Sequence, residues 1–164
     1  MSSTHDVGKG RKRARILVLG FGNPGRADDG LGPKFVERIE ALELPGVTTS
    51  IDYQLNIEHA DLVAQHEIVV FADAATDAED AFYLRAIEPA SNAPTVSSHH
   101  VPPAAILGLA RDCYDAHPRA FVVGLRAHDL DRFHEGLTEE AERNLERALA
   151  HLVPMLAGDR SFPD

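Results

Sequence analysis

Three acidic or imidazole side chains stand where predicted strands give way to loops. Asp29, Asp73 and His99 each follow or end an apolar run and precede a loop or a helix. The carboxyl ends of parallel strands meet at one edge of a sheet, where ligands bind. Two carboxylates and one imidazole suit a divalent transition metal such as zinc, nickel or iron, and leave positions open for water or substrate. We therefore predict that the three side chains converge on one metal-contacting site.

Each of these residues also has a purely structural interpretation. Asp29 precedes a predicted helix, where it would serve as an N-terminal cap. Asp73 could accept hydrogen bonds from loop amides at the end of its strand. His99 has a histidine neighbour, His100, and spacing alone does not choose between them. The residues by themselves leave both kinds of role open.

The segment that carries Asp29 has the pattern of a strand, a turn and a helix. Residues 16–19 form a continuous apolar run, typical of a strand buried on both faces, and Gly20 and Gly22 allow a sharp turn at its end. Asp28 and Asp29 follow in the loop before a helix. That helix is indicated by apolar residues at helical spacing, namely Phe35, Val36, Ile39 and Leu42.

The remaining chain alternates between strand and helix patterns. Strands are predicted over residues 47–53, 67–72, 82–87 and 120–125, with 82–87 at an edge because Pro89 stops it. Helices are predicted over 57–65, with Asn56 as its cap, from Pro102 or Pro103 to Tyr114, and after a Thr138 cap until Pro154 ends or kinks the helix. This alternation predicts a three-layer α/β/α sandwich with a mostly parallel sheet of about five strands.

Composition favours a single domain in a reducing compartment. The 164 residues are 44% hydrophobic, enough for one core, and the formal net charge of −10 disfavours nucleic acid and anionic membranes as partners. The one cysteine, Cys113, excludes a disulfide framework, and its helical spacing predicts a core position. We expect a cytoplasmic protein with a disordered basic tail at 1–15, one α/β domain at 16–157 and a C-terminal tail at 158–164.

The string GFGNPG at residues 20–25 has two misleading matches. It fits the dinucleotide fingerprint GxGxxG, but Pro24 interrupts the turn, and two carboxylates at the helix start would repel a diphosphate. It also resembles the opening of bacterial peptidyl-tRNA hydrolases. The chain then continues RADDGLGP instead of the segment found in those enzymes, and its acidity suits a tRNA substrate poorly. That activity remains a remote alternative.

Three segments in order resemble the hydrogenase maturation endopeptidase family. They are GFGNPGRADDGLG, then VVFADAA, then SSHHVPPAAILGLA, and together they span nearly the whole predicted domain. The family has a GxGN turn leading to D-(D/E)-G-x-G, a buried strand ending in Asp, and an S-x-H before a helix. The resemblance selects His99, because it follows Ser97 and Ser98 as the family's histidine does.

The resemblance implies an enzyme that removes the C-terminal extension of a nickel–iron hydrogenase large-subunit precursor after nickel insertion. The family's metal-contacting positions correspond to Asp29, Asp73 and His99, while Asn23 and Asp28 match its glycine-turn segment. Gly25 stands where relatives commonly have a leucine, a departure that bears on the substrate groove. The nickel would come with the precursor, and no organic cofactor is implied.

The expected reaction is hydrolysis by water. No GxSxG elbow, HExxH helix or Cys–His pair is present to supply another nucleophile. Asp29 or Asp73 would then act as the catalytic carboxylate that helps to activate water, an aspartyl endopeptidase activity. A non-enzymatic alternative is a chaperone in which the same residues only sense nickel on the large subunit.

Overall fold

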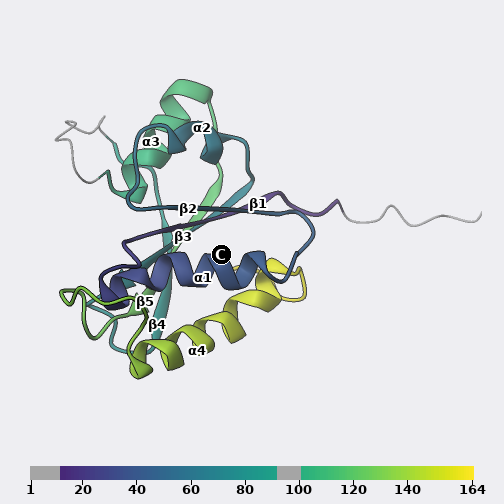
Figure 1. Cartoon of the computed structure of the whole chain (residues 1–164). Helices are drawn as coiled ribbons and strands as arrows, with labels where there is room; N and C mark the ends of the chain where they lie inside the picture. Colours follow the sequence, from purple (N-terminus) through teal and green to yellow (C-terminus); the bar gives the residue numbers. More distant parts are fainter. Residues whose placement is uncertain (1–11, 92–100) are drawn as a thin grey trace, which may run out of the picture.

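The computed structural model describes residues 12–91 and 101–164 of the chain (Figure 1). Most of the predicted basic tail and His99 lie outside these ranges. The described elements alternate between strand and helix and follow the order β1 (Ile16–Phe21), η1 (Ala27–Gly30, a 3₁₀ turn), α1 (Leu31–Glu40), β2 (Val47–Asp52), α2 (His59–Ala64), β3 (Ile68–Ala75), β4 (Phe82–Ile87), α3 (Pro103–Tyr114), β5 (Arg119–Arg126) and α4 (Glu139–Leu156).

The described strands form one five-stranded sheet in the order β2-β1-β3-β5-β4. Neighbouring strands are parallel except β4, which runs antiparallel to β5 at one edge. The predicted strand number, the mostly parallel sheet and the edge position of 82–87 are confirmed. The chain continues from β1 to β2 on one side of β1 and then to β3 on its other side, so the order of the strands reverses at β1. Open α/β sheets bind ligands in the crevice at such a reversal.

Helices cover both faces of this sheet, as predicted for a three-layer sandwich (Figure 1). Alternate residues of β1 point to opposite faces: Ile16 and Val18 pack with α1 and α4, whereas Leu17 and Leu19 pack with α2 and α3. A strand with a hydrophobic layer on each side is apolar at every position, which explains the continuous run in the sequence.

The helix α1 lies unusually close to the sheet next to the predicted site. A side chain on Gly32 would collide with the carbonyl oxygens of Ala72 and Phe21, and one on Gly20 would reach the Gly32 oxygen at 2.5 Å. The absence of side chains at Gly20 and Gly32 therefore lets the first turn of α1 rest on the carboxyl ends of β1 and β3.

Several local predictions were wrong in detail. The strand at 67–72 begins at Ile68 and extends to Ala75, so Asp73 lies within β3 instead of after it. The helix α2 begins at His59, and the Asn56 side chain accepts a bond from Glu58 N in the preceding turn. Leu42 lies beyond α1 and is half exposed.

The predicted core position of Cys113 was also wrong, because its side chain is exposed on α3. The cap of α4 is confirmed, since Thr138 Oγ1 accepts a bond from Ala141 N at 3.2 Å, whereas Pro154 lies inside that helix. Beyond α4, Phe162 is buried and stacks on Phe121. Among the described residues, none of the helices combines the length and hydropathy needed to cross a lipid bilayer.

Candidate active site

Asp29 and Asp73 line one cleft at the carboxyl edge of the sheet. The cleft has a volume of about 580 Å³ and lies where β1 stops pairing with β3, since Gly20 opposite Ala72 is their last pair. Its walls come from the turn at residues 20–25, called the glycine turn below, and from the segment after β2, the start of α3, and the strands β4 and β5. The predicted convergence of the two carboxylates is thus observed at the crevice expected from the strand order.

The glycine turn fixes the direction of Asp29. Gly22 has φ +144°, and a side chain there would overlap the Asp29 carbonyl oxygen, so the turn and the aspartate pack in direct contact. Asn23 N then donates a hydrogen bond to Asp29 Oδ2 at 2.8 Å. Asp29 is not the cap of α1, because the cap position is Gly30 and no side chain bonds to the helix amides there. The structural interpretation of Asp29 as a helix cap was wrong.

Asp73 carries a strongly perturbed carboxyl group. Burial raises its pKa from 3.8 to about 7, the backbone amide of Ala74 opposes this rise, and the nearby charge of Asp29 adds to it. Near neutral pH the group can therefore either hold or release a proton. Carboxyl groups with pKa values close to the working pH are typical of functional sites in clefts.

Tyr83 is a cleft residue that the sequence interpretation missed. It lies on β4 opposite Gly124 of β5, and a side chain on Gly124 would collide with the Tyr83 ring. Burial raises the pKa of the Tyr83 hydroxyl, with a further rise from Asp77. The pairing of an aromatic residue with a glycine on the neighbouring strand was the available signal, but it requires the order of the strands to be known.

Asp28 has a structural role that sequence reasoning left undefined. Its carboxylate is fully buried and accepts four hydrogen bonds of 2.8–3.0 Å, from the backbone amides of His128, Asp129 and Thr138 and from the Thr138 hydroxyl. Asp28 therefore ties the turn that carries Asp29 to the loop between β5 and α4. Its donors lie 100 to 110 positions away, so local sequence gave no sign of them.

Two carboxylates that line one cleft suit a cation, since the charge of Asp29 disfavours the ionised form of Asp73 until a positive charge is present. Asp29 uses Oδ2 for its bond to Asn23 N, and a carboxylate has acceptor capacity on both oxygens. The predicted third member, His99, lies outside the described residues. Within residues 12–91 and 101–164, no group of three or more His, Cys, Asp or Glu side chains is arranged to hold a metal.

The fold is shared with solved structures of hydrogenase maturation endopeptidases. The hydrogenase maturating endopeptidase HybD from Escherichia coli is 27% identical over 85% of this chain and 92% of its own, with a TM-score of 0.57. An endopeptidase from Escherichia coli is 26% identical over 88% of this chain and 93% of its own, with a TM-score of 0.66. The chain is similar in fold and in part of its sequence to solved hydrogenase maturation endopeptidases.

A third solved structure shares the fold at lower sequence identity. The NiFe hydrogenase maturation protease HycI from Thermococcus kodakarensis has a TM-score of 0.69 at 22% identity, over 90% of this chain and 95% of its own. No protein-family model and no curated protein matches the chain. Because these neighbours are endopeptidases, the comparison favours a peptide hydrolase over the chaperone and peptidyl-tRNA hydrolase alternatives.

Proposed function

We propose that the chain is an endopeptidase that removes the C-terminal extension of a nickel-loaded nickel–iron hydrogenase large-subunit precursor. One observation carries the proposal: Asp29 and Asp73 open into a single cleft on the fold of the hydrogenase maturation endopeptidases. The neighbours' names identify proteases of hydrogenase maturation, and the two carboxylates supply groups suited to metal recognition and hydrolysis.

In this proposal nickel is part of the substrate. Asp29 and Asp73, with His99 as the third ligand, contact the ion carried by the precursor and so permit cleavage only after metal insertion. Val101 and Pro102, which follow His99 closely along the chain, line the same cleft and support its inclusion. No organic cofactor is required, and the place of action is the cytoplasm.

The proposed nucleophile is water, activated by one of the two carboxylates. Asp73 is the better candidate for proton transfer because burial brings its pKa to about 7. Its ionised form accepts a proton as the water oxygen attacks the scissile carbonyl carbon. The C–N bond then breaks, and a proton passes to the departing amine. Asp29, held by Asn23 N, is better suited to a fixed contact with the metal.

A processing assay separates this function from its main alternative. Purified chain is mixed with nickel-loaded and nickel-free precursor, and the products are followed by gel shift and by the mass of the released peptide. We expect a shortened large subunit and a single C-terminal peptide from the nickel-loaded precursor alone.

Binding without cleavage would instead identify a nickel-sensing chaperone. That outcome is detected in the same samples by size-exclusion chromatography, which separates a stable complex from the free precursor. Cleavage of both precursor forms at equal rates would reject metal recognition while retaining the peptidase.

A further inference from the structure

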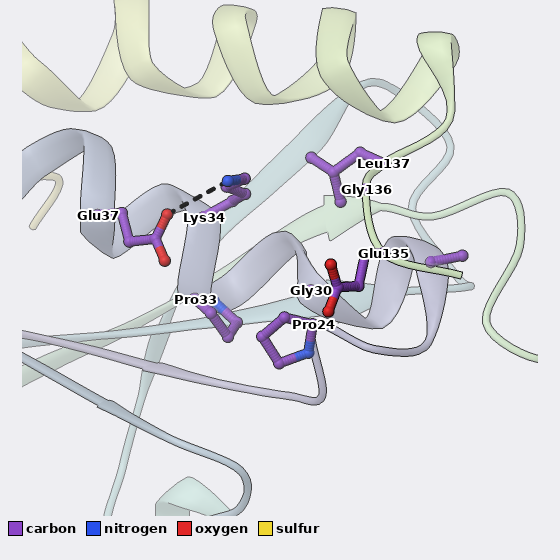
Figure 2. A pocket seen from close by; sticks show the side chains of 9 residues that line it. Pro24, Gly30, Pro33, Lys34, Glu37, Glu135, Gly136 and Leu137 are labelled. Carbon is purple, nitrogen blue, oxygen red and sulfur yellow. Dashed lines mark hydrogen bonds and ion pairs between the residues drawn. The ribbon is translucent and has the colours of Figure 1, made fainter. Parts of the chain in front are cut away.

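A smaller cavity lies beside Pro24, next to the glycine turn. It has a volume of about 190 Å³ and opens between α1 and residues 135–137, the loop segment that precedes α4 (Figure 2). Pro24, Pro33 and Leu137 give it apolar walls. Neither the metal contact nor the water activation proposed above uses this cavity.

The small cavity and the active-site cleft are near one another, because a third hollow shares wall residues with each of them. Gly22 and Tyr53 line both the cleft and an intermediate cavity of about 260 Å³. Pro24 lines both that intermediate cavity and the small one beside α1. The hollows therefore follow one another over the glycine turn, which is the arrangement needed to hold an extended peptide at successive side chains.

The outer wall of the small cavity is held in place before any ligand arrives. Asp28 anchors the loop at His128, Asp129 and Thr138, as described above. Backbone bonds add to this anchorage, since Ala27 N donates to His134 O at 2.8 Å and His134 N donates to Gly25 O at 3.1 Å. A cavity with such a wall loses little conformational entropy when it is filled.

The charges around the small cavity favour a cation. Glu37 and Glu135 contribute two carboxylates, and Lys34 contributes one ammonium group, which lies 3.4 Å from Glu37 Oε2 (Figure 2). Lys34 and Glu37 are both about half exposed, so their ion pair contributes little and is readily exchanged. Lysine and arginine side chains combine an apolar stem with a charged end, which matches apolar walls below an acidic rim.

We propose that this cavity is a specificity subsite that receives a basic side chain of the precursor's C-terminal extension. The inference rests on the proposed function and adds the part of the substrate that lies beyond the scissile bond. An extension can lie as an extended strand across the glycine turn, whereas the folded body of the large subunit is too bulky to follow a series of small hollows. The aliphatic stem packs on Pro33 and Leu137, and its cationic end meets Glu37 and Glu135.

A scan of single lysines along the extension tests the subsite. Nickel-loaded precursors carry extensions of alanine and serine in which a single lysine occupies each position in turn, and KM for processing is measured with wild-type enzyme. Lysine at one position of the extension is expected to give a lower KM than lysine at the others. Glu37→Gln with Glu135→Gln should raise KM for that substrate by about fivefold, the effect of roughly one partly shielded ion pair, with kcat unchanged.

Two further variants make the result specific. Glu40→Gln removes an exposed carboxylate from the same helix, outside the cavity wall, and should leave KM unchanged. Glu135→Lys should reverse the preference, so that glutamate replaces lysine as the favoured residue at that one position. A change in fold alone would not reverse the preference.

Cleavage of the natural precursor distinguishes failure of the proposed function from failure of the subsite alone. If wild-type enzyme does not cleave the nickel-loaded natural precursor, the proposed function and the subsite both fail. If it does cleave that precursor, but no lysine position responds to the Glu37 and Glu135 variants, the function stands and the subsite is overturned.

Discussion

Replacing Asp73 by asparagine is expected to stabilise the folded chain near neutral pH while it abolishes processing. The buried carboxyl of Asp73 has a pKa of about 7 in the folded protein against an ordinary value of 3.8. The folded state therefore binds this proton more tightly than the unfolded state does. Its favourable contribution is complete below pH 3.8 and is lost progressively as the pH rises to about 7.

The size of the effect follows from the same two values. At roughly 1.4 kcal/mol per pKa unit, the difference between 3.8 and about 7 corresponds to about 4 kcal/mol of lost stability above neutral pH. Asp73 opens onto a cleft that admits water, and this screening reduces the expected penalty to about 2 kcal/mol. Asparagine has nearly the same shape and no charge, so Asp73→Asn avoids the penalty.

Urea unfolding followed by circular dichroism at pH 4 and pH 8 measures the prediction. Asp73→Asn should exceed the wild type by about 2 kcal/mol at pH 8, and the two should converge at pH 4. Asp80→Asn is the matched control, because Asp80 is exposed in the acidic loop after β3. A variant that is less stable than the wild type at pH 8, or a difference that does not change with pH, would refute the assignment of a desolvated carboxyl.

Two other predictions concern neighbouring residues. Asp28→Asn should lower the free energy of unfolding by about 3 kcal/mol in the same assay, because the N–H groups of the new amide would face the backbone N–H groups that now donate to the carboxylate. Thr138→Ala keeps that carboxylate and should cost only about 1 kcal/mol. Equal losses for the two variants would contradict this role of Asp28. His99→Ala should weaken nickel, zinc or cadmium binding in calorimetric titrations much more than His100→Ala, and equal losses would reject the choice of His99.

The sheet and the meeting of two carboxylates could be predicted from sequence because they depend on local patterns and one general rule. Strands buried on both faces read as continuous apolar runs, and the carboxyl ends of parallel strands share an edge. Asp29 and Asp73 line one cleft at the edge of the sheet that these two facts indicate. The structural interpretation of Asp29 as a cap failed because the cap position falls on Gly30 and Asn23 N binds the carboxylate instead.

The features that could not be predicted depend on distant partners or on the ends of elements. The Asp28 carboxylate accepts hydrogen bonds from a loop a hundred residues away in the sequence. Tyr83 reaches the cleft because its neighbour on the adjacent strand is Gly124, which has no side chain. Helical spacing alone placed Cys113 in the core, yet whether a helical position is buried depends on which face of the helix the sheet covers. Leu42 was assigned to a helix that ends at Glu40.

Cleavage of nickel-loaded precursor by Asp29→Asn and Asp73→Asn decides whether this cleft is the processing site. The peptide released is quantified by mass spectrometry at equal concentrations of folded enzyme, with Asp80→Asn as the control. We expect the control to cleave like the wild type. Both site variants, although folded, should release no peptide, because an amide is a poor metal ligand and cannot accept a proton from water. Normal cleavage by both site variants would contradict the assignment of this cleft as the processing site.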